Sequence, residues 1–204
     1  SVCIGIFGPI SVVVSGGSRV THQHIPIIAP VCCAGIRCFG GCRLIPRQVE
    51  QVRFLRNNQD GTFSEQTEAA GLKGILGGLN LIHADYNNDG FVDFLVLRGG
   101  WLGKGGQHPN SLLRNNGDGT FTDMTIEAGL ANANWPTQTA TWDDFNSDGL
   151  LDLFVGNEMA PSQLYINQGD ETFVDVAKSA GTTNDRFSKG TVAGDFNADG
   201  RPDI

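Results

Sequence analysis

The sequence has no cysteine after Cys42, no acidic residue before Glu50 and no long apolar run. All five cysteines lie in the first 49 residues, so no disulfide can form within the rest of the chain. The longest apolar stretch, residues 2–14, is interrupted by Pro9 and is shorter than the roughly 20 residues that a membrane-spanning helix needs. We therefore predict no transmembrane segment in this chain.

Charge is divided just as unevenly along the chain. Residues 1–49 contain four Arg and no Lys, whereas residues 50–204 carry all 22 acids against 10 basic residues, a net charge of −12. This change in composition predicts a boundary near Pro46. An acidic body lacks the basic footprint that nucleic-acid phosphates require. The composition therefore argues against a nucleic-acid partner and suits a protein that collects cations.

The segment 1–49 shares none of the features of the rest of the chain. We interpret it as an atypical N-terminal segment, either the remnant of a secretory signal whose basic start is missing or an artefact of how the sequence was derived. Residues 50–204 form the second predicted domain. Its many glycines, among 28 in the whole chain, together with only 18% charged residues, indicate a turn-rich β protein rather than a helical one.

Three nine-residue loops in this second domain share one pattern of oxygen-bearing side chains. Positions 1, 3, 5 and 9 are Asp or Asn, and position 6 is always Gly, which permits a sharp turn. Ca²⁺ takes about six to eight oxygen ligands, and short acidic loops supply them, helped by a backbone carbonyl at position 7. The predicted ligands are the side chains of Asp85, Asn87, Asp89 and Asp93 with the carbonyl of Phe91; those of Asp144, Asn146, Asp148 and Asp152 with the carbonyl of Leu150; and those of Asp195, Asn197, Asp199 and Asp203 with the carbonyl of Arg201.

The residues after each loop decide which kind of calcium fold this is. An EF-hand needs flanking helices and a bidentate Glu at position 12, but that position is Val96 in the first loop and Val155 in the second. Instead, the apolar, β-rich segments 91–97 and 150–155 follow the loops. Each loop is therefore predicted to join two strands of a hairpin.

A second repeated unit is predicted to be a strand, a turn and a strand. In two copies the turn contains a Gly, Gly61 or Gly119, at a position expected to have positive φ, but the third copy has Glu171 there, so its turn must differ or carry strain. An Ala-Gly segment that is expected to form a single helical turn ends each unit. The three copies span residues 54–63, 112–121 and 164–173.

The acidic loops recur after 59 and 51 residues, a period typical of propellers and other repeat arrays. One period holds four predicted strands, at about 138–145, 150–156, 162–167 and 172–176, and successive apolar residues in them indicate burial on both faces. The predicted fold is all-β: a partial β-propeller of four-stranded antiparallel blades, with two full blades and two incomplete ones.

Four aromatic or imidazole side chains on or near the connections are candidates for a ligand-facing surface: Trp101, His108, Trp135 and Trp142. The more common role of such Trp side chains is to fill gaps between blades. No Ser, His and Asp set, and no Cys and His set, is repeated or spaced to suggest a nucleophile. We therefore predict that the chain is not an enzyme.

These residues resemble the FG-GAP, or VCBS, repeats of integrin-α-type β-propellers, and most of all those of the bacterial relatives of cartilage acidic protein, which often carry an ASPIC/UnbV domain. The chain lacks an ASPIC/UnbV segment and does not keep the literal Phe-Gly…Gly-Ala-Pro signature. The resemblance covers residues 50–204. The resemblance rests mainly on residues 115–121, 136–142, 144–157 and 189–196.

The resemblance implies a calcium-binding module that is secreted, extracellular or periplasmic, and that binds or scaffolds a protein or glycan ligand. The alternative is a carbohydrate-active enzyme, a polysaccharide lyase or hydrolase, on a propeller scaffold. An acidic pair about 5–10 Å apart at the propeller axis would favour that enzyme. A calcium buffer is disfavoured, because the loops are embedded between strands.

Overall fold

The computed structural model of the chain describes residues 11–14, 51–99, 108–131 and 134–204. Within these residues there are eleven strands and one helix of four residues, which confirms the predicted all-β class. The proposed secretory signal and Trp101 lie outside the described residues, apart from the short strand 11–14. The chain divides into two compact units, of which the second comprises residues 69–71 and 78–204.

The first unit contains one three-stranded sheet in the order β1-β2-β3. β2 (Arg53–Asn57) and β3 (Phe63–Glu65) form the antiparallel hairpin predicted for the first copy of the repeated unit. β1 (Ser11–Val14) pairs with β2 in parallel, which the sequence reasoning did not predict. Its run of three valines has the β-branched character that suits a strand.

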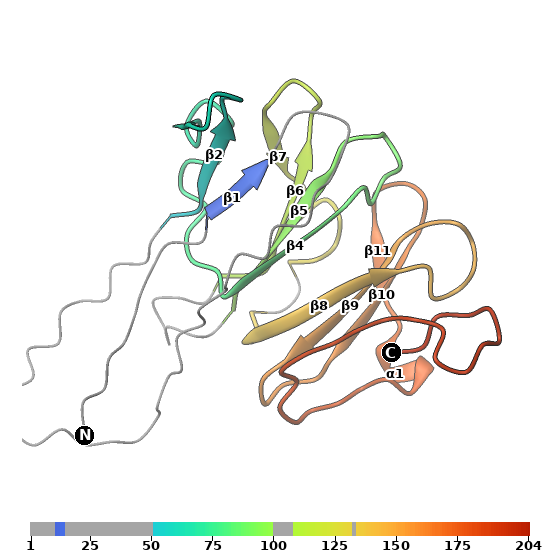
Figure 1. The fold of residues 1–204 in the computed structure, drawn as a ribbon. Helices are drawn as coiled ribbons and strands as arrows, with labels where there is room; N and C mark the ends of the chain where they lie inside the picture. The colour runs from blue at the N-terminus through green and yellow to red at the C-terminus, as the bar shows by residue number, and fades with distance from the viewer. Residues whose placement is uncertain (1–10, 15–50, 100–107, 132–133) are drawn as a thin grey trace, which may run out of the picture. The chain divides into compact units, whose positions relative to one another are not determined.

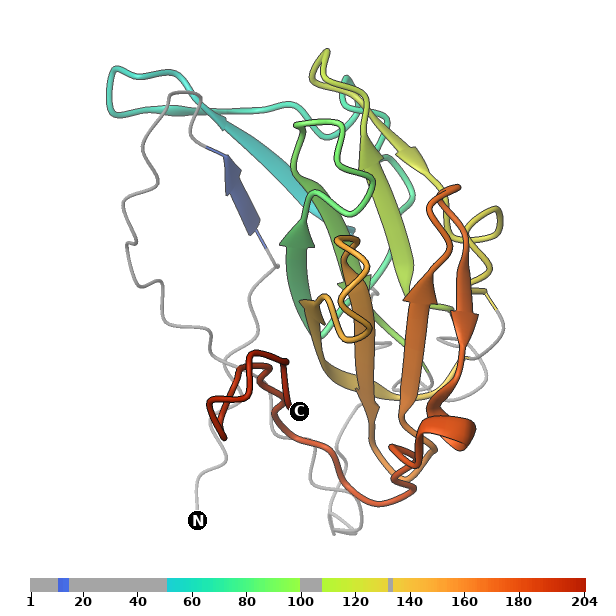
Figure 2. The ribbon, with the colours of Figure 1, turned by 90° about the vertical axis from the view of Figure 1, so that its right-hand side faces the viewer.

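The second unit contains two four-stranded antiparallel sheets, each with the strand order expected of a propeller blade (Figures 1 and 2). Each strand pairs with the next along the chain, so both blades are meanders. The strand limits agree with the sequence prediction to within about two residues. The first blade consists of β4 (Asn80–Ala84), β5 (Asp93–Leu97), β6 (Ser111–Asn115) and β7 (Phe121–Asp123), and the second of β8 (Thr137–Asp143), β9 (Asp152–Asn157), β10 (Gln163–Asn167) and β11 (Phe173–Asp175).

The central strands β5 and β9 are buried along their whole length, as predicted for blades that pack face to face. Side chains alternate between the faces. Leu153 and Val155 of β9 join the core shared by the two blades, whereas Phe154 packs with Leu164 in a separate cluster. The absence of apolar–polar alternation in these strands follows from this two-sided burial.

Three aromatic rings form the centre of the core between the two blades. Tyr86 lies 6.4 Å from Trp142 in a stacked arrangement and 5.9 Å from Phe173, and the rings of Trp142 and Phe173 are 6.1 Å apart. Trp142 therefore fills a gap between blades, which is the more common of the two roles considered for it. Trp135 is partly exposed.

The Ala-Gly segments join each fourth strand to the next repeat. The N–H of Phe173 donates to the carbonyl of Ala128 over 3.1 Å, and the N–H of Phe121 donates to that of Ala70 over 2.9 Å. Gly129 has a φ of 76°, and a Cβ there would lie 3.2 Å from the Phe173 carbonyl oxygen. Only the third segment forms the predicted helical turn, α1 (Ala177–Ala180), since the other two are hydrogen-bonded turns.

Candidate metal centre: three acidic loops

The three acidic loops lie where hairpin connections were predicted. The first connects β4 to β5 and the second connects β8 to β9. The third spans residues 195–203 and is closed by an antiparallel bridge between Gly194 and Asp203. All three loops are therefore located between paired segments of backbone rather than between helices.

Within the first loop, the side chains at positions 1 and 3 accept the same backbone N–H, that of position 5. The N–H of Asp89 donates to the carboxylate of Asp85 over 3.0 Å and to the amide oxygen of Asn87 over 3.3 Å. The carboxylate of Asp85 also accepts the N–H of Gly90 over 2.9 Å. Asn87 Nδ2 in turn donates to Asp89 Oδ2 over 2.9 Å, so these three side chains lie together on the inside of the loop.

The other two loops repeat this arrangement bond for bond. Their first Asp, Asp144 or Asp195, accepts the N–H groups of positions 5 and 6 over 3.0 and 2.8 Å in both loops. The Gly at position 6 has the positive φ that was predicted for it, 88°, 86° and 85° in order. Position 4 is also left-handed, which the sequence did not indicate, because its residue type changes from loop to loop. The residues at position 4 are Asn88, Ser147 and Ala198.

In the first two loops, the aspartate at position 9 is buried and links its loop to the third strand of the blade. Asp93 is 1% exposed, and its carboxylate accepts the N–H of Tyr86 over 3.2 Å and that of Asn115 over 2.7 Å. Asp152 does the same with the N–H groups of Phe145 and Asn167, over 3.0 and 2.9 Å. Position 9 therefore has a structural role that is already visible in the protein alone.

Burial also changes the acidity of these two carboxyls. The loss of solvent raises the pKa of Asp93 to about 6, against the two backbone hydrogen bonds, which lower it. The negative charges of Asp89 and Asp85 add to the increase. Burial raises the pKa of Asp152 in the same way, with smaller contributions from Asp148 and Asp144. The three acids of each of these two loops therefore lie within electrostatic reach of one another.

The side chains at positions 1, 3, 5 and 9 of each loop supply oxygens on an acidic turn, which is the type of ligand that Ca²⁺ prefers. In the described part of the chain, however, no group of three or more His, Cys, Asp or Glu side chains is arranged to hold a metal. In the first loop, the oxygens of Asp85 accept the N–H groups of positions 5 and 6, whereas those of Asp93 accept the N–H groups of Tyr86 and Asn115.

The first loop is also tied to the second blade. Tyr86, at position 2, is fully buried, and its carbonyl accepts Asn167 Nδ2 over 2.9 Å. Its hydroxyl lies 3.5 Å from Glu171 Oε2, which also forms a 2.8 Å ion pair with Arg114 of β6. Burial, with the nearby Glu171 carboxylate, raises the pKa of Tyr86, so the phenol stays protonated. The first loop is therefore part of the junction between blades.

Glu171 takes the left-handed conformation, with a φ of 67°, where the other two turns have Gly61 and Gly119. The sequence predicted that this turn would differ or carry strain. Its backbone keeps the left-handed turn, and its side chain forms the ion pair with Arg114 across the junction. A non-glycine residue in this conformation costs about 1 kcal/mol, which is similar to the value of a half-exposed ion pair.

We therefore predict that Glu171→Ala and Glu171→Gly will differ in stability. Both changes remove the ion pair with Arg114, but only glycine relieves the left-handed backbone, so the glycine variant should be more stable by about 1 kcal/mol. Urea denaturation of the two variants measures this difference directly. Equal stabilities would contradict the assignment of strain to Glu171.

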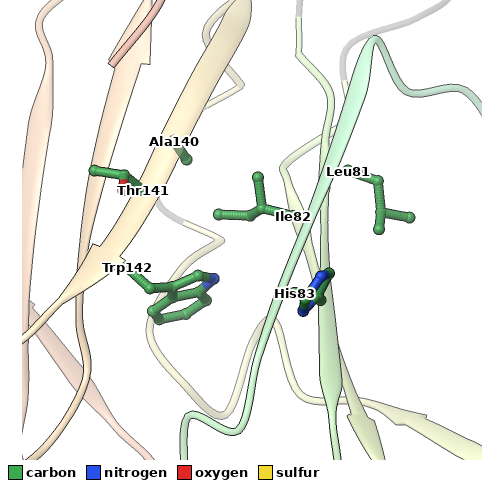
Figure 3. A pocket seen from close by; sticks show the side chains of 6 residues that line it. All are labelled: Leu81, Ile82, His83, Ala140, Thr141 and Trp142. Atoms are coloured by element: carbon green, nitrogen blue, oxygen red, sulfur yellow. The ribbon is translucent and has the colours of Figure 1, made fainter. Parts of the chain in front are cut away.

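A cavity of about 350 Å³ lies between the first strands of the two blades (Figure 3). The side chain of Ile82 extends from β4 toward β8, while that of the neighbouring His83 lies on the other side of β4. The indole N–H of Trp142 is buried and has no hydrogen-bond partner among the described residues. The cavity has no carboxylate in its lining, so it does not offer the pair of acids that glycoside cleavage uses.

A model of the FG-GAP-like repeat family matches residues 44–96, 85–155 and 144–204. The second and third matches begin at the first aspartate of an acidic loop and end just after the following loop. Together the three matches cover well over half of the chain. The acidic loops thus mark the period of the family's repeat.

Three curated relatives are named Cartilage acidic protein 1. The Homo sapiens protein is 25% identical over 162 residues, which is 74% of this chain and 24% of that protein. The Mus musculus protein is 33% identical over 94 residues, covering 45% of this chain and 14% of its own length. The Xenopus tropicalis protein is 44% identical over 54 residues, covering 26% of this chain and 8% of its own length. The chain spans about a quarter or less of the length of these relatives.

Proposed function

Because this chain belongs to the FG-GAP-like repeat family, we propose that it is a calcium-stabilised module of an exported β-propeller that binds or scaffolds a ligand. Repeats of this family form propeller-type binding modules and are typical of extracellular proteins. Calcium, export and the nature of the ligand are the parts that we propose. The described residues include no helix with the length and apolarity to cross a membrane.

The observation that carries the proposal is the threefold repetition of one loop geometry. In each loop the side chains at positions 1 and 3 accept the N–H of position 5, with the same donors and acceptors. A shared ligand that requires oxygens explains the repetition.

In the first loop, the residues that would hold the cation are Asp85, Asn87, Asp89 and Asp93, with the carbonyl of Phe91. When bound, the cation would supply positive charge that offsets the repulsion between carboxylates and the cost of burying one of them. The protein's own contribution is to fix the turn. Gly90 allows the reversal, and the buried Asp93 holds the loop against the N–H of Asn115.

We expect calcium to stabilise the chain, and calorimetric titration with thermal unfolding tests this directly. Sites of the extracellular type bind at about 10⁻⁴ to 10⁻³ M, and a site held at about ten times its dissociation constant gains about 1.4 kcal/mol. Chelation should therefore lower the unfolding temperature. Asp148→Ala should remove the contribution of the second loop and leave that of the first loop intact.

The matched control is Asp118→Ala, which removes an exposed acid from the β6–β7 turn rather than from a loop. It should alter the overall charge equally and leave the number of calcium sites unchanged. If a folded chain shows no saturable heat of calcium binding up to about 10 mM, an order of magnitude above the weak end of the expected range, the calcium proposal is wrong.

A further inference from the structure

Two residues that break the repeat lie at the same cavity. Position 7 of the acidic loops is Phe91, Leu150 or Arg201, so only the first loop has an aromatic side chain there. The equivalent left-handed residue of the three hairpin turns is Gly61, Gly119 or Glu171, so only the third turn has a side chain there. Both residues line one cavity of about 390 Å³, together with Arg114 and the amide side chains of the first loop and the β6–β7 turn.

Phe91 provides an apolar platform in this cavity. Its side chain is large and the residue is 45% exposed. The tip of the ring packs against Gly117, because a Cβ added there would lie 2.5 Å from the Phe91 Cζ atom. The absence of a side chain at Gly117 thus makes room for the tip of the ring. An exposed aromatic ring held in this way is suited to stacking against a ligand.

The polar groups around the platform have hydrogen-bonding capacity to spare. Glu171 uses only Oε2 in its contacts with Arg114 and Tyr86, and Oε1 has no partner among the described residues. Asn88 is exposed, and its side-chain amide makes no hydrogen bond within the described part of the chain. The cavity therefore offers a free carboxylate oxygen and a free amide beside an aromatic face.

These features indicate the chemistry of the ligand. A pyranose has an apolar C–H face that can stack on a ring, and hydroxyls that pair with amides and carboxylates. An anionic ligand is disfavoured, because Arg114 is already paired with Glu171 and Asp89 is also in the lining. We propose that this cavity binds a neutral sugar unit of a glycan, an assignment that rests on the proposed role as a binding module.

Saturation-transfer NMR and calorimetry on the full chain test this with cellobiose, maltose and lactose as neutral probes and chondroitin sulfate as an acidic one. We expect at least one neutral disaccharide to bind saturably. Phe91→Ala should weaken that binding at least tenfold, and Asn88→Ala should weaken it severalfold. The sugar-binding proposal is overturned if no neutral probe binds saturably, or if only the acidic polymer binds.

Two control variants make the result specific to this cavity. Phe187 is a similarly exposed aromatic, at 54%, on a different segment, so Phe187→Ala should leave sugar binding unchanged. Ser147 has the same left-handed backbone as Asn88, with a φ of 62°, so Ser147→Ala controls for the turn itself. If Phe91→Ala stays folded and binds sugar as tightly as the original chain, the assignment is wrong.

The calcium titration separates a failure of this inference from a failure of the proposed function. Asn88→Ala removes no proposed calcium ligand, so calcium should still raise the unfolding temperature of this variant. Calcium stabilisation without sugar binding would overturn only the glycan site. Sugar binding without any calcium response would overturn only the calcium proposal.

Discussion

Replacing Tyr86 with Ala should lower the free energy of unfolding by about 3–5 kcal/mol, the usual cost of removing a large aromatic side chain from a core. Tyr86 is fully buried and contacts both Trp142 and Phe173 at the centre of the junction between blades. The surrounding side chains come from two sheets, so they are not free to collapse into the space. Urea denaturation followed by tryptophan fluorescence measures the loss.

The same loop position offers a matched control in the third loop. Phe196 is also at position 2 but is 67% exposed, so Phe196→Ala should change the stability by no more than about 0.5 kcal/mol. Tyr86→Phe keeps the ring and removes only the long contact with Glu171, and it should cost less than about 1 kcal/mol. Similar losses for Tyr86→Ala and Phe196→Ala would contradict the central role of Tyr86 in the junction.

The strands, the hairpins and the position of the loops were predicted because each depends on neighbours in sequence. Gly at position 6 of the loops, and Gly61 and Gly119 in the turns, report a local backbone requirement that only a few residue types satisfy. The apolar runs in β5 and β9 report burial on both faces. The family resemblance rests on the same local patterns, and it is confirmed.

The junction between blades could not be predicted, since its contacts join residues far apart in the chain. Glu171 was expected to disturb its turn, but nothing near it in sequence indicates that its carboxylate pairs with Arg114. Asp93 was predicted as a metal ligand, and its hydrogen bond to the N–H of Asn115 depends on the register of β5 and β6. Such register-dependent contacts appear only once the sheet is formed.

The sequence did not predict strand β1, and the reason differs from that for the junction between blades. A short apolar run fits a signal remnant as well as it fits a strand, because both need the same few apolar residues. Its parallel pairing with β2 requires a long connection, and no turn signal announces such a pairing. The hairpin of β2 and β3, whose turn chemistry is local, was recognised from the sequence.

In the presence of a chelator, we expect the chain to lose stability as the pH rises from about 4 to 7. The pKa of Asp93 is about 6 in the folded chain, against an ordinary value of 3.8. Between these values the unfolded chain has released this proton while the folded chain still holds it, so folding becomes less favourable as the pH rises. Each pH unit of the interval corresponds to about 1.4 kcal/mol, so the expected loss is of the order of 2–3 kcal/mol. Urea denaturation at a series of pH values measures it.

The difference between the original chain and Asp93→Asn isolates this contribution, because the variant has no proton to release at that position and its stability should vary less over the same range. Asp118→Asn is the control. The hydrogen bonds from Thr120 lower the pKa of Asp118, so its titration lies below the interval and this variant should keep the full pH dependence. Added calcium should oppose the loss, since a cation beside the buried carboxylate favours its charged form. If Asp93→Asn in chelator shows the same fall in stability as the original chain, the ionisation of Asp93 is not its cause, and the electrostatic reason for calcium binding in the first loop fails with it.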